Sequence, residues 1–210
     1  MNSPRRRLWL AVFCLGGMGG MAPVLAGPPN RSSPASPSGD EAAPVGAALD
    51  QLLKRALGTP QLLGQAGFRY FGFSVYHAQL WVGQRPRDAE STWPQQPVVL
   101  SLQYQRDFKG EAIAQRSIEE MRRHPLMREA AQDTWLQTLK GILPDVREGE
   151  RLIGIHQPGV GLQMWHQGNQ LRELGGVPDP TLARVFMGIW LDPSTSAPEL
   201  RQRLLGLAKP

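Results

Sequence analysis

The chain has 210 residues, of which 41% are hydrophobic and 20% charged, a composition that can form one domain with an apolar core. Three of its basic residues lie in an N-terminal segment without acidic residues, so loss of that segment lowers the formal net charge from +5 to about +2. This small excess gives no reason to expect nucleic acid as a partner, and little reason to expect binding to an anionic membrane.

Residues 1–26 have the pattern of a secretory signal peptide: three arginines, an apolar run, and the small residue Ala26 at the expected cleavage site. A single membrane anchor is the alternative, but glycines and a proline interrupt the run, which is short for a span. Cleavage after Ala26 removes Cys14, the only cysteine, and leaves no disulfide or thiol. We therefore expect a periplasmic or secreted protein, exported by the Sec route rather than the twin-arginine route, that meets the membrane only transiently through its leader.

Residues 27–46 are rich in proline, serine, glycine and alanine, which cannot form an apolar core and predict a flexible linker. Residues 47–210 then form one domain. A first short helix is expected over residues 48–57, where leucines recur at helical spacing and Gly58 follows.

The next residues predict strands, first over 61–66 and then over 67–83, the longest β-like run in the chain. Gly72, in the middle of this run, is interpreted as a bulge or bend. Further strands are expected over residues 98–105, 151–155, 161–166 and 170–174.

Helices are expected between and after these strands. A helix capped by Asp107 or a neighbour runs to Arg123, and another begins after Pro125 and ends before Pro144. Asp179 and Ser196 are expected to cap the two C-terminal helices. This order of elements predicts an α+β fold with a mainly antiparallel sheet.

The sequence has no phosphate-binding loop, no metalloprotease His-Glu-x-x-His motif and no nucleophile elbow. Its four histidines lie at spacings that fit no metal pair on one helix face. Glu119 and Glu120 are interpreted as solvated helix charges rather than paired catalytic acids. No metal or other cofactor is expected.

Arg69, Tyr70, Tyr76 and Tyr104 are the polar residues that could bind a ligand. An arginine on a mostly apolar strand needs a partner, which is either an acidic ligand or a carboxylate of the protein. Arg69 and Tyr76 are seven residues apart, so an unbroken strand places them on opposite faces, and a bulge near Gly72 is needed to bring them together.

Five stretches of the chain, in order, resemble the chalcone isomerase-like family in its bacterial exported branch. The resemblance extends from about Leu62 to Gly206, and its stretches are residues 67–69, 71–82, 102–123, 144–169 and 183–206. It implies the chalcone isomerase fold, a large antiparallel sheet with helices packed on one face and a ligand cleft between them.

The resemblance also implies two kinds of function. Plant chalcone isomerases close a flavanone ring with the help of an arginine, and fatty-acid-binding relatives hold a carboxylate with an arginine and a tyrosine. Arg69 and Tyr76 resemble these residues, and Ile189 and Trp190 resemble residues that line the isomerase cleft. The other polar groups of the isomerase site have no match, which favours binding.

We therefore expect a protein that binds a small amphipathic acid, fatty or aromatic, in a cleft beside the sheet. The expected ligand-binding residues are Arg69, Tyr70, Tyr76, Tyr104, Ile189 and Trp190. One alternative is an isomerase (intramolecular lyase) of the chalcone isomerase type, with Arg69 and Tyr76 as catalytic residues. The other alternative is a non-catalytic structural or interaction protein.

Overall fold

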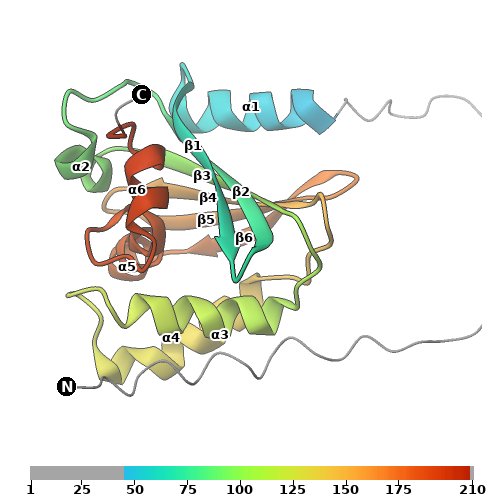
Figure 1. Cartoon of the computed structure of the whole chain (residues 1–210), viewed down its shortest axis with the longest axis vertical. Helices are drawn as coiled ribbons and strands as arrows, with labels where there is room; N and C mark the ends of the chain where they lie inside the picture. The colour runs from blue at the N-terminus through green and yellow to red at the C-terminus, as the bar shows by residue number, and fades with distance from the viewer. Residues whose placement is uncertain (1–44, 209–210) are drawn as a thin grey trace, which may run out of the picture. The chain divides into compact units, whose positions relative to one another are not determined.

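The structure is a computed structural model that describes residues 45–208 (Figure 1). The predicted leader and residues 27–44 of the predicted linker lie outside the described residues. Residues 45 and 46, assigned to the linker from the sequence, belong instead to the first helix, α1 (Val45–Leu57). Among residues 45–208, no helix has both the length and the apolar character needed to cross a bilayer.

Six strands form one antiparallel sheet in which chain order and spatial order coincide. Each strand pairs with the next along the chain, so the sheet is built entirely from antiparallel neighbours. The prediction of an α+β fold with a mainly antiparallel sheet is confirmed. The strands are β1 (Gln61–Tyr70), β2 (Phe73–Val82), β3 (Val98–Tyr104), β4 (Arg151–Gln157), β5 (Gly161–Gln167) and β6 (Leu171–Val177).

The prediction of one strand over residues 67–83 is wrong, because the chain reverses direction at Phe71 and Gly72. These two residues have φ values of 46° and 83°, and Tyr70 pairs with Phe73 across them. Positive φ at both central residues is the signature of a type I′ turn, which suits the twist of a two-residue hairpin. The aromatic residues on both sides continue the β-like pattern through the turn and conceal it in the sequence.

One face of the sheet carries the main core and is covered by four helices: α3 (Gly110–Met121), α4 (Gln132–Ile142), α5 (Pro180–Leu191) and α6 (Pro198–Leu204). Alternate strand residues such as Ala78, Leu80, Leu100 and Leu102 point into this core. The short helix α2 (Ala89–Thr92) and two 3₁₀ helices, Trp93–Gln95 and Glu129–Ala131, lie in the connections.

The opposite face is partly covered by α1, so the helices are not confined to one face as expected. Leu52 and Leu53 of α1 pack on Val99, Ile153 and Ile155 in a second cluster. Strands β3 and β4 carry apolar side chains on both faces, and each face needs cover from water. The members of both clusters within residues 45–208 lie between positions 49 and 205, so the chain that follows the predicted leader retains all of them.

Of the predicted N-terminal helix caps, only the one at Asp179 forms. Its carboxylate accepts hydrogen bonds from the Thr181 and Leu182 amides, each at 2.9 Å. Helix α3 begins only at Gly110, whose amide donates to Asp145, while Asp107 accepts from the Glu148 amide. Helix α6 begins at Pro198, and no side chain caps it.

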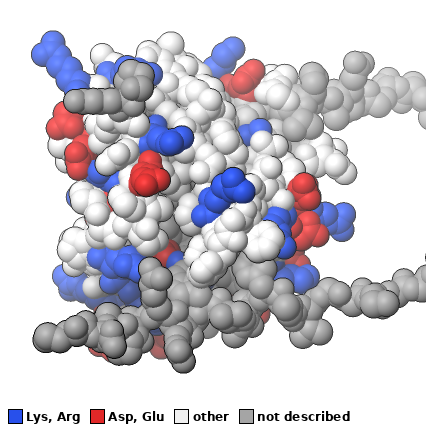
Figure 2. Space-filling view, viewed as in Figure 1, with Lys and Arg blue, Asp and Glu red and all other residues white. Residues whose placement is uncertain are grey.

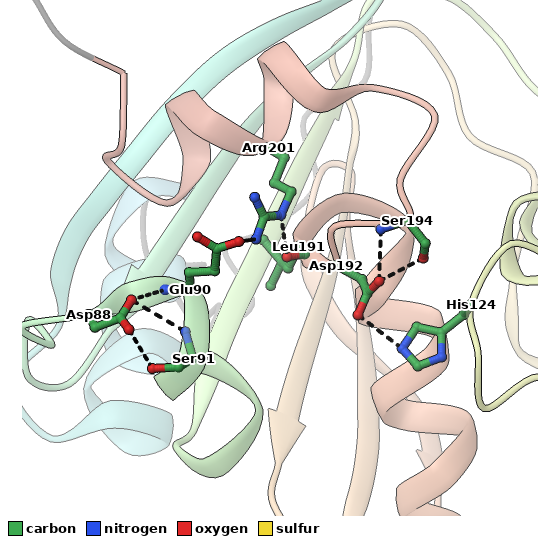
Figure 3. A network of polar contacts seen from close by, with 8 residues as sticks. All are labelled: Asp88, Glu90, Ser91, His124, Leu191, Asp192, Ser194 and Arg201. Atoms are coloured by element: carbon green, nitrogen blue, oxygen red, sulfur yellow. Dashed lines mark hydrogen bonds and ion pairs between the residues drawn. The ribbon is translucent and has the colours of Figure 1, made fainter.

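A polar network ties the ends of the helices together (Figure 3). Arg201, which is 7% exposed, donates to the Leu191 carbonyl at 2.8 Å and pairs with Glu90 at 2.6 Å. This arrangement compensates a buried charge and joins α6 to α5 and α2. Beyond the end of α3, His124 lies 3.3 Å from Asp192, and its Nδ1 accepts from the Leu126 amide.

Burial lowers the pKa of His124, and the nearby Asp192 opposes this shift only in part. Burial also lowers the pKa of His156, although its contact with the Pro94 carbonyl acts in the other direction. Both imidazoles therefore resist protonation in the folded protein more than in the unfolded chain, where the pKa is about 6.5.

We predict that the free energy of unfolding decreases as the pH is lowered from 7.5 to 5.5. The unfolded state takes up protons at both histidines over this range before the folded state does, which favours unfolding. Urea titrations at the two pH values measure the effect. The double variant His124→Asn, His156→Asn should be less stable but nearly insensitive to pH in this window, and an unchanged pH dependence would contradict the assignment.

Candidate functional site

Three aromatic residues from adjacent strands lie in a row on the face that α3–α6 cover. Tyr76 is opposite Phe68 in β1 and opposite Tyr104 in β3. The ring centroids of Tyr76 and Phe68 are 5.1 Å apart and stacked, and those of Tyr76 and Tyr104 are 6.1 Å apart and edge to face. The register of the sheet thus brings together two of the tyrosines singled out from the sequence.

Trp190 of α5 connects this row to the helices. Its indole Nε1 donates a hydrogen bond to the Tyr76 hydroxyl at 3.0 Å. Burial raises the pKa of Tyr76, although the Trp190 hydrogen bond and the charge of Arg116 oppose the rise. Burial, with Tyr76 nearby, also raises the pKa of Tyr104. Both phenols are therefore protonated at neutral pH and can donate hydrogen bonds, but they cannot act as bases.

A cavity of about 40 Å³ lies between the sheet and helices α3 and α5. Part of its floor is Gly154 of β4, where a Cβ atom would lie 3.5 Å from the Met164 sulfur and 3.7 Å from the Met187 sulfur. Such a volume holds about three water molecules and is well below the several hundred Å³ typical of ligand pockets. The side chains therefore close this space almost completely.

The cavity wall is apolar except for a few groups, which include Tyr104, Ser117 and Trp190. Ser117 already donates to the Ile113 carbonyl at 2.8 Å. The Tyr104 hydroxyl has no hydrogen-bond partner within residues 45–208. The hydroxyl is not one of the fully buried polar atoms that lack a partner, and at the cavity wall it can donate to any group that enters.

A more open hollow of about 240 Å³ lies where the end of α4 meets β6, and its lining includes Arg172 and Glu173. No aromatic side chain lines it, and its two charged groups have opposite signs. We therefore place the candidate site at the cavity beside Tyr104.

The structure does not bring Arg69 to this cavity. Arg69 follows Phe68 in β1 and points to the opposite face of the strand. Its guanidinium is exposed and donates to the Gly72 carbonyl at 2.8 Å, back across the hairpin turn. Gly72 belongs to the turn rather than to a bulge, and the register shift that the hairpin does contain lies between Phe68 and Arg69. The Arg69 guanidinium bonds the turn there, so this shift does not direct it to Tyr76.

Arg116 of α3 is the cation near the tyrosines, and sequence reasoning did not identify it. Its charge opposes the rise of the pKa of both Tyr70 and Tyr76, so its guanidinium lies within electrostatic range of both phenols. It also pairs with Glu119 at 2.8 Å and with Glu120. In the sequence these three residues look like ordinary ion pairs on a helix surface. The sequence has no signal that identifies Arg116, because only the structure shows that Ile113 and Ser117 beside it line the cavity.

Of the other residues expected to bind the ligand, only one lines the cavity. Trp190 lines the cavity, whereas Ile189 is not among its lining residues and packs at the edge of the main core. Tyr70 lies next to the hairpin turn, with its ring 4.5 Å from that of Phe71. Within residues 45–208, no three histidine or acidic side chains lie close enough together to hold a metal ion.

Comparison with known proteins identifies a family and a similar fold. Residues 48–206 match the family described as chalcone isomerase-like. The structure is similar to the crystal structure of a fatty-acid binding protein from Arabidopsis thaliana, with a TM-score of 0.52, 15% sequence identity, and coverage of 70% of this chain and 87% of that one. At this identity the similarity shows the fold alone. No curated protein sequence matches the chain.

We predict that Tyr76→Phe lowers the free energy of unfolding by about 1–3 kcal/mol, because the buried indole N–H of Trp190 loses its acceptor. Tyr104→Phe is the matched control. It removes a hydroxyl that has no partner among the described residues, so it should change stability little or raise it slightly. Urea titration of both variants tests this, and an equal loss in the two would show that the Trp190 hydrogen bond contributes nothing specific.

Proposed function

The chain belongs to the chalcone isomerase-like family, and from this we propose that it binds a small amphipathic acid, fatty or aromatic, between the sheet and helices α3 and α5. The observation that carries the proposal is the apolar cavity with the Tyr104 hydroxyl at its wall. An apolar space with one unused donor suits a molecule with an apolar body and a polar group.

The acid group of the ligand would be held by the phenols and by Arg116. Tyr76 and Tyr104 are protonated, so each can donate to a carboxylate oxygen. Arg116 supplies positive charge near Tyr70 and Tyr76 and can add a charge-assisted contact. In this proposal Arg116 takes the role that the sequence suggested for Arg69.

Binding requires the cavity to widen, because about 40 Å³ cannot hold an acyl chain or an aromatic ring. Three of the lining side chains are Met164, Met187 and Trp190. Methionine side chains are flexible and repack at low cost. If Trp190 moves, the Tyr76 hydroxyl loses the hydrogen bond from the indole and forms one with the ligand instead. The lost bond is an ordinary hydrogen bond, which contributes roughly 1 kcal/mol.

The class of ligand is further supported by the similar Arabidopsis structure, which is that of a fatty-acid binding protein. That protein has the same fold at 15% identity, so it suggests a lipid-like acid without indicating which residues hold it. We also propose that the protein acts outside the cytoplasm after loss of residues 1–26, as the signal-peptide pattern suggests.

An isomerase of the chalcone isomerase type is the alternative that the same family membership supports. Protonated Tyr76 and Tyr104 could stabilise a developing oxyanion. Arg116 is paired with Glu119 and Glu120 in either case, so it does not distinguish the two functions. A chalcone cyclisation assay separates the two functions: turnover lost in Tyr76→Phe would establish the enzyme in place of the binding protein.

We predict that gently purified protein carries a fatty or aromatic acid, detectable by mass spectrometry after organic extraction. Gly154→Val should reduce binding of added lauric acid at least tenfold, because the new side chain fills the cavity floor. Gly67→Val is the matched control. It places the same side chain on another strand of the sheet, where a Cβ has nothing within 4 Å. Equal loss in both variants would place the ligand elsewhere.

We predict that Arg116→Gln weakens lauric acid binding about tenfold, the value of one charge-assisted contact. Arg69→Gln should leave binding within about twofold, because its guanidinium lies on the opposite face of β1. Methyl laurate should bind both variants and the unmodified protein alike, since it has no negative charge. If Arg69→Gln weakened lauric acid binding more than Arg116→Gln does, Arg69 would be the anion-binding residue. Arg123 stays 3.3 Å from Glu120 in Arg116→Gln and limits the cost of the change to folding.

A further inference from the structure

The tip of the β1–β2 hairpin exposes two large aromatic side chains. Phe71 is 77% exposed and Phe73 is 62% exposed, more than any other large hydrophobic residue within residues 45–208. They stand on either side of Gly72, with Tyr70 next to them. The tip is therefore a convex aromatic projection rather than a groove.

The stability of the fold does not explain the presence of Phe71. Its φ of 46° lies in the left-handed region, where a Cβ atom is crowded and where asparagine or glycine is preferred in a type I′ turn. The exposed ring gains little from burial in return. A strained backbone at an exposed aromatic residue suggests that the side chain has a use outside the fold.

The charges within the hairpin and against its exposed rings are basic. Residues 61–82, which form the whole hairpin, contain no aspartate or glutamate and one arginine, Arg69. The Arg69 guanidinium bonds the turn itself through the Gly72 carbonyl, and the Arg106 guanidinium lies 5.0 Å from the ring centroid of Phe73. In the view of Figure 2, uncharged surface at the free end of the hairpin adjoins Lys and Arg side chains.

We propose that this tip, defined by residues 69–73, inserts into the headgroup region of an anionic lipid bilayer. Aromatic side chains favour the interface between membrane and water, where an apolar body can be buried while polar groups stay wet. Arginines beside them gain from the negative surface potential and can extend to the headgroups. This contact is a property of the folded domain, distinct from the transient contact expected of the leader, and it requires no ligand in the cavity.

The test uses the chain from Gly27 to Pro210, which keeps every described element and both cores but lacks the apolar leader. Its sedimentation is measured with vesicles of phosphatidylglycerol and phosphatidylcholine in equal parts, and with vesicles of phosphatidylcholine alone. We expect stronger binding to the anionic vesicles. The double variant Phe71→Asn, Phe73→Thr should bind them at least tenfold more weakly, since two aromatic rings no longer leave water.

Val160→Asn is the matched control, because Val160 is 61% exposed at the turn between β4 and β5, and it should change binding less than twofold. Arg69→Gln should weaken binding to anionic vesicles about fivefold, and binding to neutral vesicles much less. Phe71→Asn alone should raise stability while it weakens binding, because Asn-Gly suits the turn; this separates the effect from unfolding.

Three results would overturn the proposal. They are no binding of the unmodified chain to either kind of vesicle, an equal loss of binding in Val160→Asn, and capture of the tip by a protein without vesicle binding. Each result leaves the ligand proposal unaffected, since lauric acid binding is measured separately without vesicles.

Discussion

The two-residue turn at Phe71 and Gly72, together with the register shift between Phe68 and Arg69, determines the register of β1 against β2. Much of the structure depends on that register. Side chains alternate between faces along a strand, so a shift of one residue would move every aromatic side chain of the hairpin to the other face. With the observed register, Phe68 and Tyr76 lie together under the helices. Tyr76 then meets Tyr104 of β3 and the indole of Trp190.

The same register separates two arginines that the sequence does not distinguish. Arg69 is adjacent to Phe68 and therefore points away from the helices, where it bonds the turn. Arg116 belongs to α3, which covers the other face of the sheet, and its charge acts on the pKa of Tyr76. An acidic ligand is favoured by a cation on the same face of the sheet as the phenol donors. The alternation of side chains along β1 places Arg69 on the opposite face.

The nearly closed cavity and the exposed tip differ in what they contribute to stability. In the cavity, close packing around about 40 Å³ of space stabilises the fold, and any ligand must displace side chains that already have contacts. At the tip, Phe71 has an unfavourable backbone conformation and an exposed ring, so it lowers stability. Proteins commonly retain such unfavourable features where they interact with other molecules.

Local patterns in the sequence were enough to predict the α+β class, the antiparallel sheet, most strands, the cap at Asp179 and the resemblance to the family. These features depend on neighbouring residues: apolar periodicity, turn residues and helix capping. The turn at Phe71 is also local, but it was missed because phenylalanine is unusual at positive φ and aromatic residues continue on both sides.

Other features were decided only by the tertiary structure. The sequence does not show that α1 covers the second face, that Trp190 bonds Tyr76, or that Arg116 rather than Arg69 lies near the phenols. Each of these depends on how elements distant in sequence pack and on which face of the sheet they cover. Burial also raises the pKa of Tyr76 and Tyr104, and only tertiary packing decides which tyrosines become buried.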